Sequence, residues 1–174
     1  MKDKQLGLKE EIILGIDPGT QITGYGLILI QGNQYIPIDF GCIRTPVSEK
    51  LSNRYLIIFN ALEELIERYK PTEVVVETQY IQKNVQSALK LGMARGIVMM
   101  AAKKWGLPIY GYSPTEAKRS VVGNGSASKF QVQGMVQKLL KLLDLPTPMD
   151  AADALALAIC HAHCASHLKD KHEI

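Results

Sequence analysis

The stretch IILGIDPGT, residues 12–20, decides the fold. Its first five residues form a continuous apolar run, which is typical of a strand buried on both faces of a sheet. The turn-forming sequence from Asp17 to Thr20 ends that strand. A second strand expected to be buried, residues 72–76, follows a segment with helical spacing at residues 48–69. This order of strand, helix and strand predicts a parallel crossover that places the two buried strands side by side.

The remaining segments complete an α/β pattern. Two further strands, residues 24–30 and 35–43, flank a tight turn at Gly32 and Asn33. After the second buried strand, the expected elements are a helix at 84–105, a strand at 108–112, a helix that starts at Ser113, a helix at 129–143 and a helix at 149–168. This order predicts an α/β fold with a mixed five-stranded sheet and helices on both faces.

The length of 174 residues and the hydrophobic fraction of 47% favour one globular domain. We expect residues 1–11 to form a polar N-terminal extension, residues 12–168 the domain, and residues 169–174 a polar C-terminal tail. No stretch has the length and apolarity of a membrane-spanning helix. Three sparse cysteines and a polar start without a signal peptide indicate a reduced, cytoplasmic setting.

Positive charge gathers in the second half of the chain. Residues 78–143 contain ten basic residues and a single acidic one, a formal charge of +9. The rest of the chain carries −6, because the whole chain carries +3. This asymmetry indicates a surface that faces a polyanion such as DNA, although solvated helix faces would give the same count.

Four carboxylates are candidates for metal chemistry. Asp17 and Glu77 each follow an apolar strand directly, so parallel pairing would place them together at the carboxyl edge of the sheet. Asp150 and Asp153 project from one face at the start of a helix. Like charges this close oppose folding unless a cation balances them. An oxygen-only set matches Mg²⁺ or Mn²⁺, and two such ions about 4 Å apart can promote hydrolysis of a phosphodiester.

Each carboxylate alone also has a structural interpretation. Asp17 before Pro-Gly could form a turn, Asp150 could cap a helix, and Asp153 could favour the helix dipole. Glu77 fits a structural role less well, because glutamate is a poor choice directly after three valines. The combination of the four favours the metal site.

The order of motifs resembles that of a known family. They are ILGIDPGT at 13–20, TGYG at 23–26, GCIRT at 41–45, SALKLG at 87–92, ARG at 94–96, VVG at 121–123, GSA at 125–127 and DAADALA at 150–156. Together they resemble the RuvC-type Holliday-junction resolvases over residues 12–163, nearly the whole chain.

The resemblance implies a ribonuclease-H-like fold and a homodimer that nicks two opposing strands of a four-way DNA junction symmetrically. It implies that Asp17, Glu77, Asp150 and Asp153 are the catalytic and metal-binding residues, with Mg²⁺, or Mn²⁺ in its place, as cofactor. It also implies 5′-phosphate and 3′-hydroxyl ends, a preference for a short T-rich sequence, a role in recombination and repair, and RuvA and RuvB as associates.

Three residues resemble DNA contacts of the family. Tyr80 occupies the position of an aromatic that stacks on opened bases, and Lys118 and Lys129 occupy positions of functional lysines. Their alternatives are a half-buried tyrosine and solvated surface lysines. Thr78 and Gln79 depart from the family's pattern, which puts its sequence preference in doubt for this chain.

The helix at residues 84–105 is the candidate dimer contact, through Ala88, Gly92, Met93 and Gly96. Small residues let two helices approach closely, and methionine fills irregular gaps. Burial of the helix against the sheet is the alternative, and the two can hold on different faces.

Other functions fit the sequence less well. The pairs Cys160 with Cys164 and His163 with His167 could share a zinc face, but helical registry aligns them only in part. Alternatively, His161 or His163 could approach the active site as an auxiliary group. A phosphotransferase of the actin, hexokinase and Hsp70 type shares an Asp-x-Gly-Thr turn but needs two domains. A junction-binding module without nuclease activity has no use for four carboxylates near phosphate.

Overall fold

The computed structural model describes residues 10–78, 84–164 and 169–174. The strands are β1 (Glu11–Asp17), β2 (Ile22–Gln31), β3 (Gln34–Arg44), β4 (Glu73–Glu77) and β5 (Ile109–Tyr112). They form one sheet in the order β3-β2-β1-β4-β5. The first three strands are antiparallel, whereas β4 is parallel to both β1 and β5. The prediction of a mixed five-stranded sheet is confirmed.

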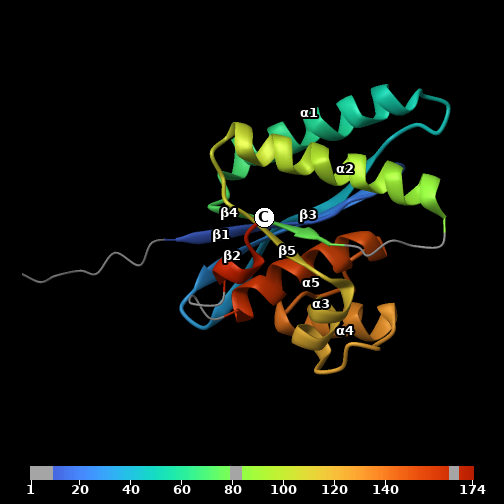
Figure 1. Cartoon of the computed structure of the whole chain (residues 1–174). Coiled ribbons are helices and arrows are strands. Elements are labelled where there is room, and N and C mark those ends of the chain that lie inside the picture. Colours follow the sequence, from blue (N-terminus) through green and yellow to red (C-terminus); the bar gives the residue numbers. More distant parts are fainter. Residues whose placement is uncertain (1–9, 79–83, 165–168) are drawn as a thin grey trace, which may run out of the picture.

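Helices cover both faces of the sheet (Figure 1). They are α1 (Leu51–Tyr69), α2 (Val85–Lys104), α3 (Pro114–Val122), α4 (Lys129–Leu139) and α5 (Met149–His163). The first two pack on one face and the last three on the other, with a separate hydrophobic core on each side. Among the described residues, no helix is both long and apolar enough to cross a membrane.

Strand β1 supplies both cores because its side chains alternate across the sheet. Ile13 belongs to the core under α5, whereas Leu14 and Ile16 belong to the core under α1 and α2. Gly15 faces α5, and a Cβ there would lie 2.1 Å from the carbonyl oxygen of Ala154. The missing side chain therefore lets α5 lie directly against the central strand.

Two predicted helices end earlier than expected. The helix predicted over 129–143 ends at Leu139, and Lys141 adopts a φ of 52°, which is outside the helical region. The helix predicted over 149–168 ends at His163, and residues 165–168 lie outside the described part of the chain. Apolar periodicity extends beyond both ends, so the pattern alone overestimates their length. The predicted start at Ser113 is confirmed by a capping box with Glu116.

Residues 169–174, expected as a polar tail, lie along β5. A short 3-10 helix, η1 (Asp170–His172), precedes a bridge between Tyr110 and Glu173, and the amide of Ile174 donates to the carbonyl of Ile109 at 3.0 Å. The ring of His172 stacks on Tyr112, with centroids 4.3 Å apart. The C-terminal segment therefore covers part of the edge strand.

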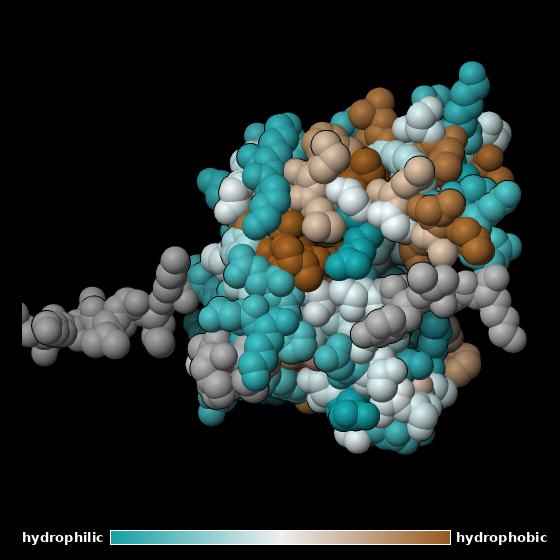
Figure 2. All heavy atoms as spheres, viewed as in Figure 1, coloured by the Kyte–Doolittle hydropathy of each residue, from teal (hydrophilic) through white to brown (hydrophobic). Residues whose placement is uncertain are grey.

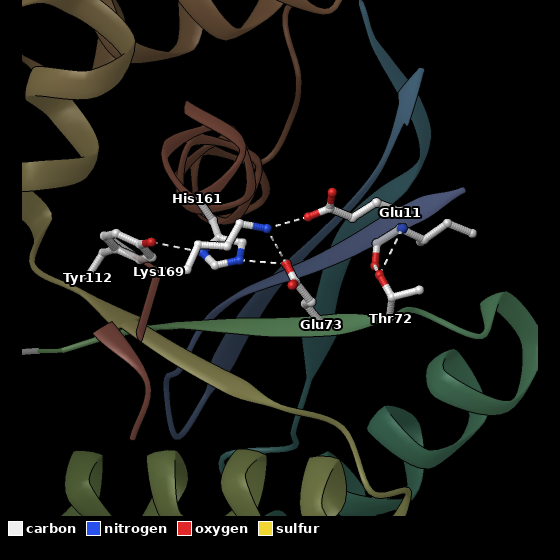
Figure 3. A network of polar contacts seen from close by, with 7 residues as sticks. Glu11, Thr72, Glu73, Tyr112, His161 and Lys169 are labelled. Carbon is white, nitrogen blue, oxygen red and sulfur yellow. Dashed lines mark hydrogen bonds and ion pairs between the residues drawn. The ribbon is translucent and has the colours of Figure 1, made fainter. Parts of the chain in front are cut away.

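A network of polar side chains holds this segment to the sheet (Figure 3). The Lys169 ammonium donates to Glu73 at 2.9 Å and also contacts Glu11, where β4 and β1 begin. His161 is fully buried, with Nε2 2.6 Å from Glu73 and Nδ1 2.8 Å from the Tyr112 hydroxyl. Burial opposes ionisation of Glu73, but the bonds from His161 and Lys169 outweigh it and lower the pKa of this carboxyl to about 2.

Replacing Glu73 with Gln should destabilise the fold in a pH-dependent way. The lowered pKa means that the carboxylate stabilises the protein above about pH 4.5 and loses this effect as the pH falls towards about 2. We expect a loss of about 1–3 kcal/mol at pH 7, because solvent screening reduces the effect of a partly exposed group. The difference from the unchanged chain should shrink between pH 5 and pH 3 in urea unfolding.

The matched control is Glu63→Gln, which removes the ion pair with Lys104 but keeps an oxygen to accept from the Trp105 indole. It should change the free energy of unfolding by less than about 1 kcal/mol. An effect of Glu73→Gln that is equally large at pH 7 and pH 3 would contradict the assignment.

Candidate active site

Asp17 and Glu77 lie at the carboxyl ends of two adjacent parallel strands. In the register of β1 and β4, Ile16 is paired with Val76, so the next residue of each strand is an acid. Both strands run through the sheet centre, where the side chains of Ile16 and Val76 are fully buried. The parallel pairing expected from the sequence therefore brings these two carboxylates to one edge of the sheet.

The start of α5 approaches the same edge. Asp17 is paired with Gly24 on β2, and a Cβ at Gly24 would lie 2.1 Å from the carbonyl oxygen of Asp150. Only a residue without a side chain allows α5 to begin this close to β2. Asp153, three residues further along, follows on the same side of the helix.

A cavity of about 200 Å³ opens between this sheet edge, α3, α4 and α5. Its charged lining consists of Asp17, Glu77, Asp153, Lys118 and Lys129. Its apolar lining consists of Pro114, Ala117, Val132, Ala156 and Leu157. Five of the predicted site residues thus share one cavity. Asp150 does not line it but lies close enough to raise the pKa of Asp17.

The electrostatics of the cavity are dominated by Asp17. Burial and, after it, repulsion from Glu77, Asp153 and Asp150 together raise the pKa of this carboxyl to about 8. Lys129 opposes it and donates to Asp153 at 2.6 Å, a bond that raises the pKa of the lysine itself. The site therefore gathers more negative charge than its own side chains neutralise.

The donor set fits a hard divalent cation. Asp17, Glu77, Asp150 and Asp153 offer carboxylate oxygens alone, which Mg²⁺ and Mn²⁺ prefer. A cation would oppose both the burial and the repulsion that raise the pKa of Asp17. The ammonium of Lys129 already supplies one positive charge at this place.

Among the described residues, one group of three has possible ligand atoms within 4.8 Å of one another, and it lies elsewhere. It consists of Glu11, Glu73 and His161, at the opposite ends of β1 and β4. Lys169 already provides the cation there (Figure 3). This cluster therefore serves the structure, and the four predicted carboxylates are more widely spaced than its members.

The residues considered for zinc have other surroundings. His161 belongs to the network around Glu73, and His163 Nδ1 lies 2.9 Å from the Ser120 hydroxyl. In the described ranges no metal-ligand group contains Cys160 or Cys164, and His167 lies outside those ranges. The structure therefore gives no support to a zinc site on α5.

Tyr80 also lies outside the described residues. The proposed dimer residues lie on α2, where Gly92 and Met93 are exposed, and Ala88 and Gly96 are half-buried. A Cβ at either glycine would meet no atom within 4 Å. The exposed apolar residues of this helix are Val85, Leu89, Met93 and Met100. Figure 2 shows hydrophobic residues gathered over α1 and α2.

Sequence reasoning missed the residues that hold the loop after Asp17. The Arg54 guanidinium donates to the carbonyl of Thr20 and to the Thr45 hydroxyl, and that hydroxyl donates to the same carbonyl at 2.8 Å. Thr23 closes the loop by donating to the carbonyl of Gly19 at 2.8 Å. The sequence signal that could have identified them is the presence of Thr23 and Thr45 in strand-like motifs, because both polar residues are buried in the structure.

Comparisons with known proteins agree with this geometry. Residues 13–161 match the family model for crossover junction endodeoxyribonuclease RuvC. The chain is 67% identical to the protein of that name from Protochlamydia amoebophila (strain UWE25) over 151 residues, which cover 87% of this chain and 90% of the relative. It is 49% identical to the protein of that name from Heliobacterium modesticaldum (strain ATCC 51547 / Ice1) over 87% of this chain and 94% of the relative.

Solved structures show the same architecture. The T. thermophilus RuvC in complex with Holliday junction substrate superposes with a TM-score of 0.86 at 30% identity, over 94% of this chain and 99% of that one. The yeast mitochondrial resolvase Ydc2 shares the fold at a TM-score of 0.60 and 16% identity, over 85% of this chain and 76% of that one. The predicted ribonuclease-H-like fold is confirmed. The chain belongs to the RuvC family of crossover junction endodeoxyribonucleases.

Proposed function

We propose that this protein resolves Holliday junctions in DNA recombination and repair. It cuts two opposing strands in a paired, symmetric, Mg²⁺-dependent hydrolysis that leaves 5′-phosphate and 3′-hydroxyl ends. The observation that carries the proposal is the cavity in which Asp17, Glu77 and Asp153 face two lysines. The junction-bound relative with the same architecture supports the choice of substrate.

The four carboxylates act as the metal-binding catalytic residues. Two Mg²⁺ ions, which Mn²⁺ can replace, would activate water and stabilise the leaving oxygen of the phosphodiester. Asp17 is the central ligand, because burial and repulsion from the other three acids raise its pKa, which a cation would lower. Glu77 completes the sheet edge, while Asp150 and Asp153 approach from α5.

The two lysines orient the DNA backbone. Lys129 and Lys118 both line the cavity, and the bond of Lys129 to Asp153 places its ammonium among the carboxylates. A phosphate that enters the cavity meets positive charge from α3 and α4 and negative charge from the sheet edge. We assign base stacking at the crossover to Tyr80, where an aromatic face can contact any base.

The active form is a homodimer, because a junction presents two equivalent strands. The outer face of α2 supplies the contact through Ala88, Gly92, Met93 and Gly96. Met93 is 55% exposed, and the two glycines leave room for a second helix. We expect this dimer to act in the cytoplasm, with the branch-migration proteins RuvA and RuvB as partners.

Replacement of Asp17 by Asn should abolish cleavage but preserve junction binding. Loss of metal stabilisation of the transition state amounts to several kcal/mol, so the rate of strand cutting should fall about a hundredfold or more. A synthetic four-way junction in Mg²⁺ measures the rate, and Ca²⁺ or EDTA should allow binding without cutting by the unchanged chain.

The matched control is Asp144→Asn, an exposed acid outside the cavity. It should cut at the normal rate. Tight binding without cutting in any metal would indicate a binding module instead, and ATP hydrolysis without DNA cutting would indicate a phosphotransferase.

The same Asp17→Asn change should stabilise the metal-free protein. Because the pKa of Asp17 is raised from 3.8 to about 8, this acid destabilises the fold increasingly as the pH rises from 4 to 8. We expect the variant to gain about 2–4 kcal/mol at pH 8 in EDTA and much less at pH 4. Urea unfolding measures the difference in the free energy of unfolding. A variant less stable than the unchanged chain at pH 8 would contradict the raised pKa of Asp17.

Replacement of Met93 by Glu should separate the dimer. A charge buried between two apolar helices is unfavourable without a partner. Light scattering after gel filtration should show a monomer, whereas Leu143→Glu, at a site 97% exposed outside α2, should leave the dimer intact. A Met93→Glu protein that stays dimeric would rule out this face.

A further inference from the structure

An exposed aromatic residue directly follows one of the cavity lysines in the chain. Phe130 follows Lys129 in the first turn of α4 and is 71% exposed. The other two phenylalanines, Phe40 and Phe59, pack against the two hydrophobic cores. Phe130 therefore adds little to the stability of the fold. An exposed ring next in sequence to a cavity lysine is a candidate for contact with the substrate.

The backbone that carries this ring is held in a defined conformation. The Ser128 side chain accepts from the amide of Gln131, and the Gln131 side chain accepts from the amide of Ser128. This capping box fixes the first turn of α4. Lys129 lines the cavity, and Phe130 is the next residue of the helix, turned about 100° around the helix axis from it.

The space on the helix beside Phe130 is open. Gly134 lies one turn further along the same side, and a Cβ there would meet no atom within 4 Å. A flat ligand can thus approach the ring without displacing protein atoms.

We propose that Phe130 stacks on a nucleobase of the strand whose phosphate Lys129 holds. The inference rests on the proposed function and deepens it by naming a further substrate-positioning residue. Lys129 and Phe130 together match the two parts of a nucleotide, a charged phosphate and an aromatic base. The stacking is independent of sequence, because every base presents a π-face.

The test compares Phe130→Ala, Phe130→Leu and Phe130→Tyr on a four-way junction with Ca²⁺, where binding is separated from cutting. The alanine variant should have a dissociation constant about five- to a hundredfold higher than that of the unchanged chain. Leucine keeps apolar area but no π-face and should fail to restore affinity, whereas tyrosine should restore it. A 2-aminopurine base placed in turn on each side of the cleavage site should lose fluorescence with the unchanged chain and with the Tyr variant only.

The control is Leu143→Ala, which truncates an exposed apolar side chain away from the cavity and should leave affinity unchanged. Because Phe130 is exposed, all variants should share the melting temperature of the unchanged chain. Unchanged affinity and fluorescence in Phe130→Ala would overturn the inference and leave the proposed function standing. A shift of Phe130→Ala to a different oligomeric state would also overturn it, in favour of a protein contact. An unchanged chain that binds no junction at all would refute the proposed function itself.

Discussion

Burial of an acidic cluster at the carboxyl edge of β1 and β4 is the constraint on which the proposed site depends. The parallel register that pairs Ile16 with Val76 leaves no freedom for the next residues, Asp17 and Glu77, to move apart. Burial and the acids of α5 then raise the pKa of Asp17 to about 8. Such a cluster lowers the free energy of unfolding of the metal-free protein, and a bound cation would raise it again.

The scaffold explains how the cluster is maintained. Gly15 and Gly24 let α5 lie directly against β1 and β2, so the helix that carries Asp150 and Asp153 cannot shift outward without losing its packing. Residues of α5 from Ala154 to Ile159 are buried almost completely. At the opposite end of the same strands, Lys169 balances Glu11 and Glu73 with an internal cation. At the start of the two strands one ammonium contacts both acids. At their carboxyl ends the Lys129 ammonium bonds Asp153, and the acids there still raise the pKa of Asp17.

Much of this could be predicted from the sequence, for a physical reason. The apolar runs before Asp17 and Glu77 are too short and too continuous for surface helices, so they specify buried parallel strands and thereby the neighbouring acids. The basic residues and Lys129 followed from charge patterning and from the resemblance to the RuvC family. Local signals also fixed the start of α3 at Ser113, because capping depends on residues close in sequence.

Other features depend on long-range contacts that no local pattern encodes. The packing of residues 169–174 on β5 requires the position of Glu73, almost a hundred residues earlier. The bond from Arg54 to the carbonyl of Thr20 likewise joins α1 to the loop after β1. The ends of α4 and α5 were overestimated because apolar spacing continues past the last helical residue.

The most direct test of the central claim is anomalous diffraction from crystals soaked in Mn²⁺. The account predicts anomalous peaks between Asp17, Glu77 and the two aspartates of α5, with none beside Lys169. Crystals that show no ion at this edge at saturating Mn²⁺, or an ion bound only between Glu11 and Glu73, would contradict it.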